Sequence, residues 1–190
     1  LELVVGEPLD VPGLDAELED LRTDGILVLR GREIVLERYL NGMTPSTRHL
    51  LQSVTKSLCA AVLGRFVGRG EIDVSQPVGH YVPELLGSAY GDATVQQTLD
   101  MAVAVAYDET YDDLSSDVNT HDRVSGWKHR RDDDPDGIEA FLRTLPATGE
   151  HGRTWLYCSA NTDVLAWVLE RVSGRRFSEL LSTELWSRMG

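Results

Sequence analysis

The chain has 190 residues, 42% of them hydrophobic, which is enough for a sizeable core in one domain, or in one domain plus part of another. Acidic residues outnumber basic ones 31 to 18, and the resulting net charge of −13 excludes most nucleic-acid and anionic-membrane partners. No apolar stretch is long enough to span a bilayer, and the start, LELVVGEPLD, lacks a secretory signal, so we expect a cytoplasmic protein with no membrane partner. The first residue is not methionine, which leaves room for a missing upstream segment.

The N-terminal part predicts a short helix followed by a β-hairpin. Residues 1–21 are acidic and end in a segment with the character of a short helix. Residues 25–40 read GILVLRGREIVLERYL, two β-rich runs on either side of Gly31, which is the pattern of a hairpin. Polar turns follow over residues 41–48. Because a two-stranded hairpin is not stable alone, it needs a helical layer or further strands.

A long apolar helix is predicted next. Residues 50–70 read LLQSVTKSLCAAVLGRFVGRG, with apolar side chains on nearly every side, so this helix belongs in the middle of a packed domain. Gly68 and Gly70 mark its end. If the helix begins near Ser53, then Lys56, three residues later, lies on the same face at the positive end of the helix dipole.

The pair of Ser53 and Lys56 could carry out nucleophilic catalysis. A serine hydroxyl attacks a carbonyl only if another group takes its proton. A lysine can take it when burial disfavours the charged amine, and free N–H groups at the helix start would stabilise an anionic oxygen. The alternative is a chance pattern, because Ser-x-x-Lys is short.

Short elements and one long polar segment fill the middle of the chain. Residues 71–82 are expected to be a connector with turns, and residues 94–101 a short helix. The run AVAVA at residues 102–106 permits either a strand or a tightly packed turn at the rim of a site. Residues 107–135 are polar and rich in aspartate, and a loop of this length in a compact domain is usually functional or mobile.

The C-terminal part is predicted to be helical at residues 137–145, 162–173 and 177–189. Residues 155–161, WLYCSAN, are expected to be extended, with Asn161 as the N-cap of the helix that follows. Tyr157 lies just before that helix, where its phenol could reach the first site and pass a proton between nucleophile and leaving group. The alternative is an ordinary buried tyrosine.

We predict no metal site and no cofactor. Cys59 and Cys158 lie in apolar contexts and are expected to be buried thiols. The five histidines lack metal-ligand spacing. Residues 132–137, DDDPDG, resemble the start of a calcium loop, but Arg143 stands where the bidentate glutamate should be, so a solvated acidic loop is expected. No G-x-S-x-G elbow of an α/β-hydrolase is present.

The motif SVTK at residues 53–56, its long helix, and YCS at residues 157–159 together resemble the serine β-lactamase and penicillin-binding-protein superfamily. The class C-like branch, which includes esterases and 6-aminohexanoate-dimer hydrolases, is the most similar, and LDMAVAVAYDETYDDLSSDV resembles the dimer hydrolases in particular. The resemblance implies an α/β (α+β) fold of the β-lactamase/transpeptidase type. Residues 1–49 would supply a helix and strands of an antiparallel sheet, and residues 50–190 a mainly helical lobe.

The resemblance also implies an acyl-enzyme mechanism. Ser53 would be the nucleophile, and Lys56 would be the base that activates it. Tyr157 would assist proton transfer to the leaving amine or alcohol. The substrate would be a small molecule, either a linear amide or a small ester.

The same resemblance suggests three residues that bind the substrate. Tyr111 matches a loop tyrosine that contacts the amide in the dimer hydrolases. Ser159 stands where many relatives carry asparagine, and it keeps a hydrogen-bond donor and acceptor with a shorter reach. Asn161 is the other candidate for this contact, with helix capping as its competing role.

One motif of the superfamily has no match in this chain. The motif Lys-Thr-Gly or His-Thr-Gly usually lies on a strand that supplies the second oxyanion donor, whereas ATG at residues 147–149 lacks the basic residue and precedes Tyr157. We therefore expect the front part of one domain without its C-terminal strands, which a second chain or a lost segment would complete. A true β-lactamase or D,D-peptidase, and a non-catalytic binding module on the same scaffold, remain alternatives.

Overall fold

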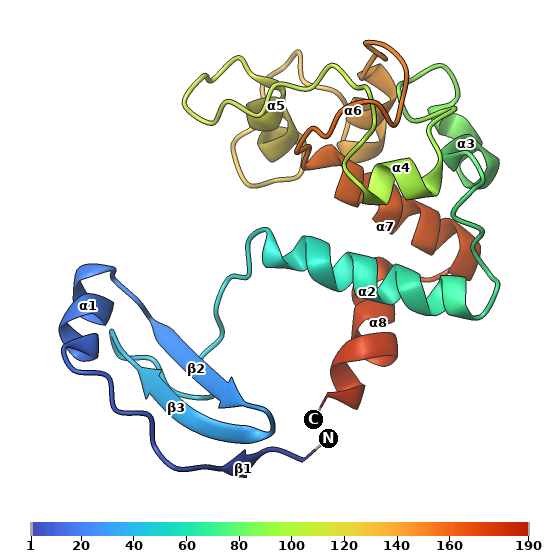
Figure 1. Ribbon diagram of the computed structural model, residues 1–190. Helices are drawn as coiled ribbons and strands as arrows, with labels where there is room; N and C mark the ends of the chain where they lie inside the picture. Colours follow the sequence, from blue (N-terminus) through green and yellow to red (C-terminus); the bar gives the residue numbers. More distant parts are fainter. Residues whose placement is uncertain (1, 190) are drawn as a thin grey trace. The chain divides into compact units, whose positions relative to one another are not determined.

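The computed structural model describes residues 2–189 and divides the chain into two compact units, Leu1–Leu51 and Gln52–Gly190. The elements of the first unit are β1 (Val4–Val5), α1 (Leu14–Asp20), β2 (Gly25–Arg30) and β3 (Glu33–Tyr39) (Figure 1).

The sheet of the first unit has the strand order β1-β3-β2. The expected hairpin is confirmed: β2 and β3 pair antiparallel, and Gly31 at the turn has a φ of 64°, a conformation that glycine adopts without steric cost. The sequence interpretation missed β1, which pairs parallel to β3, so this part of the sheet is mixed rather than antiparallel. A bulge between Val28 and Leu29 lets the consecutive residues Val35 and Leu36 of β3 both be buried.

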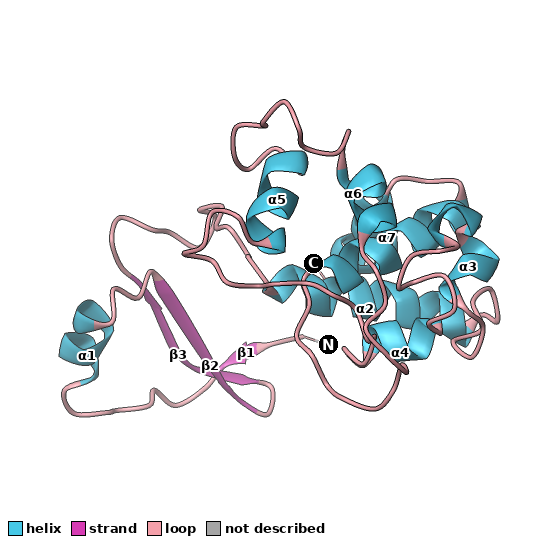
Figure 2. Ribbon diagram, turned by 90° about the horizontal axis from the view of Figure 1, so that it is seen from above, coloured by secondary structure: helices cyan, strands magenta, loops and turns pink. Residues whose placement is uncertain are grey.

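The second unit is helical in its described part. Its α-helices are α2 (Val54–Gly68), α3 (Val78–Tyr81), α4 (Val95–Leu99), α5 (Asp117–Val124), α6 (Ile138–Thr144), α7 (Ala160–Ser173) and α8 (Phe177–Leu180). Its other helical turns are η1 (Pro83–Leu85), η2 (Leu181–Leu185) and η3 (Trp186–Arg188). Helix α7 packs between α2 and α4, and α5 and α6 lie toward the N-terminal end of α7 (Figures 1 and 2). One apolar core joins these elements.

Helix α2 begins immediately after Ser53, as predicted, but it is not buried on all sides. Its buried side chains all lie on one face: Cys59, Val62, Leu63 and Phe66. Val54 is 57% exposed, and Ala61 is exposed as well. The expectation of burial on all sides is therefore wrong, because within this unit the helix packs along one side only. The sequence of the helix is apolar on the other side as well, because small residues lie there.

Both cysteines are fully buried thiols, as predicted. The Cys59 thiol lies between α2 and α7 and donates to the Thr162 carbonyl at 3.8 Å. Burial raises the pKa of Cys59 to about 12 and the pKa of Cys158 to about 11.

The other helices of the second unit agree with the sequence prediction in part. The short helix at residues 94–101 is α4, which begins with a capping box between Thr94 and Gln97. Helix α7 ends at Ser173, the predicted last residue, and Gly174 follows with a φ of 69°, a conformation that favours glycine. The long polar segment contains α5, which the sequence interpretation missed. The single helix expected at residues 177–189 is divided into an α-helical turn, a π-helical turn and a 3₁₀ turn.

The acidic run at residues 132–137 is not simply solvated. Arg123 of α5 binds both carboxylate oxygens of Asp134 at 2.8–3.0 Å, and the Asp134 side chain is only 3% exposed. Hydrogen bonds from Arg123 and from the Arg131 backbone lower the pKa of Asp134 to about 2. Among residues 2–189, no His, Cys, Asp or Glu side chains cluster in a way that would hold a metal ion. The helices described for this chain are also too short or too polar to cross a membrane.

Candidate active site

Ser53 lies at the N-cap position of α2, yet its side chain makes no capping hydrogen bond. The hydroxyl is therefore free to interact with groups outside the helix. The preceding residue, Gln52, has a φ of 48°. This is a left-handed backbone conformation that residues other than glycine and asparagine rarely adopt. Residues held in such sparsely populated conformations cluster at functional sites.

Lys56 contacts the Ser53 hydroxyl from one helical turn below. Its Nζ donates a hydrogen bond to Ser53 Oγ at 3.1 Å. The contact follows from local geometry, because residues three apart on a helix share a face. The two side chains that the sequence predicted as a pair are therefore in direct contact.

Tyr157 reaches the same hydroxyl from a distant part of the chain. Its phenol donates to Ser53 Oγ at 2.9 Å, and Lys56 Nζ lies 5.2 Å from the centre of its ring. The segment before α7 is fixed by the backbone bond from Leu156 N–H to the Met101 carbonyl, at 2.7 Å. Three groups that can exchange a proton thus meet at one oxygen atom.

Asn161 does not lie with these groups. The prediction that it caps α7 is wrong, because the helix begins at Ala160 and Asn161 falls inside its first turn. Its side chain is turned into the core and is 1% exposed. There it accepts from the Tyr90 phenol at 2.9 Å and donates to the Thr98 carbonyl at 3.2 Å. Both ends of the amide have protein partners, which favours a structural role for Asn161.

A second cluster contains Tyr111 and Ser159, joined by the carboxylate of Glu109. The Tyr111 phenol donates to Glu109 Oε1 at 2.8 Å. The Ser159 hydroxyl donates to the same oxygen at 2.5 Å, and the Ser159 backbone N–H donates to Oε2 at 2.9 Å. Partial burial and the bond to Glu109 raise the pKa of the Tyr111 phenol. Tyr111 itself is 59% exposed, which leaves its ring open to a ligand.

The sequence did not single out Glu109 as a candidate for this site. It lies two residues before Tyr111 in a polar segment with several acidic side chains, and no spacing distinguishes it from the others. Only the contact with Ser159, fifty residues further along the chain, marks it. The one available signal was its place inside the segment that resembles the dimer hydrolases.

The loop that carries Glu109 and Tyr111 is fixed by a buried amide on α5. Asn119 is fully buried, and its Nδ2 donates to the carbonyls of Tyr111 at 3.0 Å and Asp113 at 2.8 Å. Lys128 in turn donates to Asn119 Oδ1 at 2.5 Å. The long polar segment is thus an ordered structure at this point rather than an open loop.

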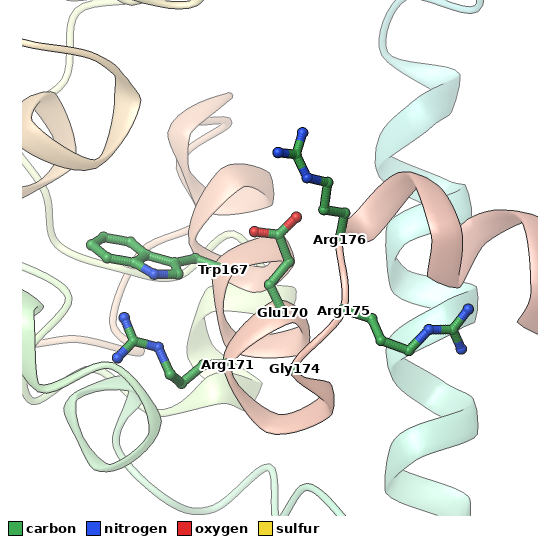
Figure 3. A pocket seen from close by; sticks show the side chains of 6 residues that line it. All are labelled: Trp167, Glu170, Arg171, Gly174, Arg175 and Arg176. Carbon is green, nitrogen blue, oxygen red and sulfur yellow. The ribbon is translucent and has the colours of Figure 1, made fainter.

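The described residues also form a cavity of about 390 Å³ at the C-terminal end of α7, away from these clusters. It is lined by Trp167, Glu170, Arg171, Gly174, Arg175 and Arg176 (Figure 3). Arg171 pairs with Glu84 at 2.8 Å, and Glu170 accepts from the backbone N–H of Phe177 at 2.6 Å. These charges already have protein partners, so the cavity is a junction between helices rather than a second candidate for catalysis.

The fold and this constellation match a known family. The family model described as Beta-lactamase matches residues 14–190, so the chain belongs to the β-lactamase family. The expected β-lactamase/transpeptidase-like fold is thereby confirmed. The chain is 51% identical over 179 residues to a 6-aminohexanoate-dimer hydrolase from Paenarthrobacter ureafaciens, an alignment that covers 94% of this chain and 45% of that relative.

Solved structures agree with this assignment. A putative 6-aminohexanoate-dimer hydrolase from Bacillus anthracis superposes with a TM-score of 0.83 at 28% identity, over 91% of this chain and 46% of that one. The octameric penicillin-binding protein homologue from Pyrococcus abyssi gives a TM-score of 0.71 at 19% identity, over 92% and 41% of the two chains, and supports the fold alone. The chain spans about half the length of the relatives it matches.

Proposed function

We propose that the protein is a serine hydrolase that acts through an acyl-enzyme on a linear amide or a small ester. The observation that carries this proposal is the pair of contacts at Ser53 Oγ, from Lys56 Nζ at 3.1 Å and from the Tyr157 phenol at 2.9 Å. A hydroxyl with two proton-transfer partners within hydrogen-bond distance has the geometry of an activated nucleophile.

In the proposed acylation step, Ser53 Oγ attacks the carbonyl carbon of the substrate while its proton passes to Lys56 Nζ, which acts as the base. The carbonyl oxygen becomes an oxyanion, which the Ser53 backbone N–H and the positive end of the α2 dipole would stabilise. The bond to the leaving group then breaks, and Tyr157 passes a proton to the departing amine or alcohol. Water hydrolyses the resulting serine ester by the same steps in reverse order.

The preference for amides rests on similarity. Two of the relatives reported above carry the name 6-aminohexanoate-dimer hydrolase, and we propose that this protein also acts on linear amides of that kind. Tyr111 and Ser159 would bind the substrate beside the nucleophile. No Lys-Thr-Gly or His-Thr-Gly motif follows Tyr157 in this chain. We propose that another segment or a second chain supplies the second oxyanion donor.

The test is active-site labelling of the full-length protein with a fluorophosphonate probe. We expect the Ser53→Ala variant to lose labelling entirely, because the nucleophilic oxygen is gone. Ser57→Ala is the matched control, since this serine lies one turn further along α2, is exposed, and should be dispensable. Equal labelling of Ser53→Ala and the wild-type protein would contradict the proposal.

The two alternatives make different predictions for turnover. A β-lactamase or D,D-peptidase would turn over nitrocefin or a D-alanyl peptide faster than linear amides and esters. A non-catalytic binding module would turn over none of them. Hydrolysis of linear amides that requires Lys56 would exclude the binding module.

A further inference from the structure

The carboxylate of Glu109 determines which way two neighbouring hydroxyl groups point. Tyr111 and Ser159 each have a single hydroxyl hydrogen, and each donates that hydrogen to Glu109 Oε1, at 2.8 Å and 2.5 Å. An ionised carboxylate can only accept hydrogen bonds, so this direction cannot be reversed. The two hydroxyl groups can therefore only accept a hydrogen bond from a ligand, through the lone pairs of their oxygen atoms.

The arrangement is held from three sides. The Ser159 backbone N–H donates to Glu109 Oε2 at 2.9 Å, which ties the carboxylate to the residue that precedes α7. Asn119 fixes the carbonyl of Tyr111 from the α5 side at 3.0 Å. Next to Glu109, the backbone N–H of Asp108 donates to Asp117 Oδ2 at 2.9 Å. Hydrogen bonds to a charged acceptor are the stronger kind, so the carboxylate has the means to impose this orientation.

We propose that Glu109 is a positioning residue that turns Tyr111 and Ser159 into hydrogen-bond acceptors, so that the site selects a substrate with an N–H donor beside the scissile carbonyl. The inference rests on the proposed function, since it concerns the substrate of the same site. An amide of a primary amine has such a donor, and an ester has an oxygen with lone pairs in its place. An ester therefore brings two sets of lone pairs together and leaves the acceptors unsatisfied.

A purely structural role for Glu109 predicts a different outcome. If the carboxylate only supported the loop, its removal would slow amides and esters alike. If it sets the direction of the hydroxyl groups, its removal should affect amides selectively. The ratio of the two activities therefore distinguishes positioning from support.

The experiment compares p-nitrobutyranilide with p-nitrophenyl butyrate, which share one acyl group, in the full-length protein. In Glu109→Gln the side chain keeps its shape but gains an NH₂ group that can donate to Ser159, which frees the Ser159 hydrogen to point at the substrate. We expect kcat/KM for the amide to fall about tenfold more than kcat/KM for the ester. Glu109→Asp, which keeps an acceptor-only carboxylate, should recover part of the amide preference. Glu139→Gln, on the exposed side of α6, should match the wild-type protein.

A double-mutant cycle with Tyr111→Phe provides a second measurement that does not depend on one variant. Because Glu109 is proposed to act partly through the Tyr111 phenol, the losses in amide kcat/KM should be less than additive. Equal losses for amide and ester in Glu109→Gln, or fully additive losses in the cycle, would overturn the inference. If Glu109→Gln fails to fold, Tyr111→Phe and Ser159→Ala must each show the selective loss of amide activity, and an unselective loss in either variant overturns the inference.

The failure of this inference can be told apart from failure of the proposed function. A fluorophosphonate has no N–H donor, so Glu109→Gln should be labelled at Ser53 at nearly the wild-type rate. Labelling with an unchanged amide-to-ester ratio would overturn the role of Glu109 alone. Absence of Ser53 labelling in the wild-type protein would overturn the proposed function and this inference together.

Discussion

The two sides of the candidate site are built in different ways. On one side, Ser53 and Lys56 are three residues apart, and the geometry of α2 alone brings them into contact. On the other side, Glu109 and Ser159 are fifty residues apart, and their contact depends on a polar loop held in place by Asn119. The first side is formed as soon as the helix is formed, whereas the second requires the whole lobe to be assembled.

This difference bears on how each side responds to substitution. A helix fixes its side chains through backbone bonds that most substitutions leave intact. A loop of polar residues has few apolar contacts to hold it, so loss of one buried hydrogen-bonding group can release several residues at once. We therefore expect changes on the helical side to alter the chemistry of the nucleophile, and changes on the loop side to alter the choice of substrate.

The largest effect is expected when the helical side is broken. Lys56→Met keeps the length of the side chain but removes the base, and we expect the rate of acylation by a fluorophosphonate to fall about 10³-fold, within the range typical of general-base catalysis. Amide and ester hydrolysis should fall equally, since both need the same nucleophile. Arg153→Met removes an exposed cation as a control. A rate for Lys56→Met within a few-fold of wild type would mean that the helical contact has no catalytic role.

A smaller and more selective effect is expected when the loop side is loosened. Asn119→Ala removes the hydrogen bonds to the carbonyls of Tyr111 and Asp113, so we expect amide kcat/KM to fall roughly tenfold while labelling of Ser53 changes little. Hydrogen exchange should accelerate over residues 109–116. Gln96→Ala removes an exposed amide on α4 and serves as the control. Unchanged exchange in this loop would show that Asn119 is not what holds it.

The smallest effect concerns the ion pair between Arg123 and Asp134, which ties α5 to the end of the same long segment. The folded pKa of Asp134, about 2, lies below its ordinary value of 3.8, so the pair contributes to stability above pH 3.8 and loses this contribution as the pH falls toward 2. Asp134→Asn should lower Tm by roughly 5 °C at pH 7, and the difference should shrink between pH 3.8 and 2.

Thermal unfolding followed by circular dichroism across this pH range measures the effect. Asp136→Asn is the control, because the Asp136 side chain is 97% exposed and its pair with Arg130 should contribute little. A Tm difference for Asp134→Asn that stays constant from pH 7 to pH 2 would show that the ion pair of Arg123 and Asp134 is not the source of the lost stability.

Much of the fold could be predicted because it depends on local signals. The hairpin around Gly31, the short helix α4 after Thr94 and the end of α7 at Ser173 all depend on neighbouring residues. The errors arose where tertiary contacts overrode local preference. Asn161 is a good N-cap by composition, but its amide has two partners in the core, and the helix begins at Ala160, two residues earlier than predicted. Strand β1 has only two residues and exists through its pairing with β3, so no pattern could show it.

In the candidate site, too, contacts between residues close in sequence could be predicted, and contacts that depend on the tertiary fold could not. The contact of Ser53 with Lys56 could be predicted from spacing, and the contact with Tyr157 became an expectation only through the resemblance of two separate motifs. Glu109 could not be predicted, because an acidic residue in an acidic loop has no distinguishing neighbour until Ser159 is brought beside it. Functional residues supplied by loops are the ones that sequence patterns describe least.

The burial of both thiols has a practical consequence for work on this protein. Thiolates, not thiols, react with electrophiles, and at neutral pH almost no thiolate exists at Cys59 or Cys158, whose pKa values are about 12 and 11. Neither thiol of this chain is therefore expected to react readily with an electrophilic reagent. A covalent adduct that forms on this chain at neutral pH can therefore be assigned to a group other than these two thiols.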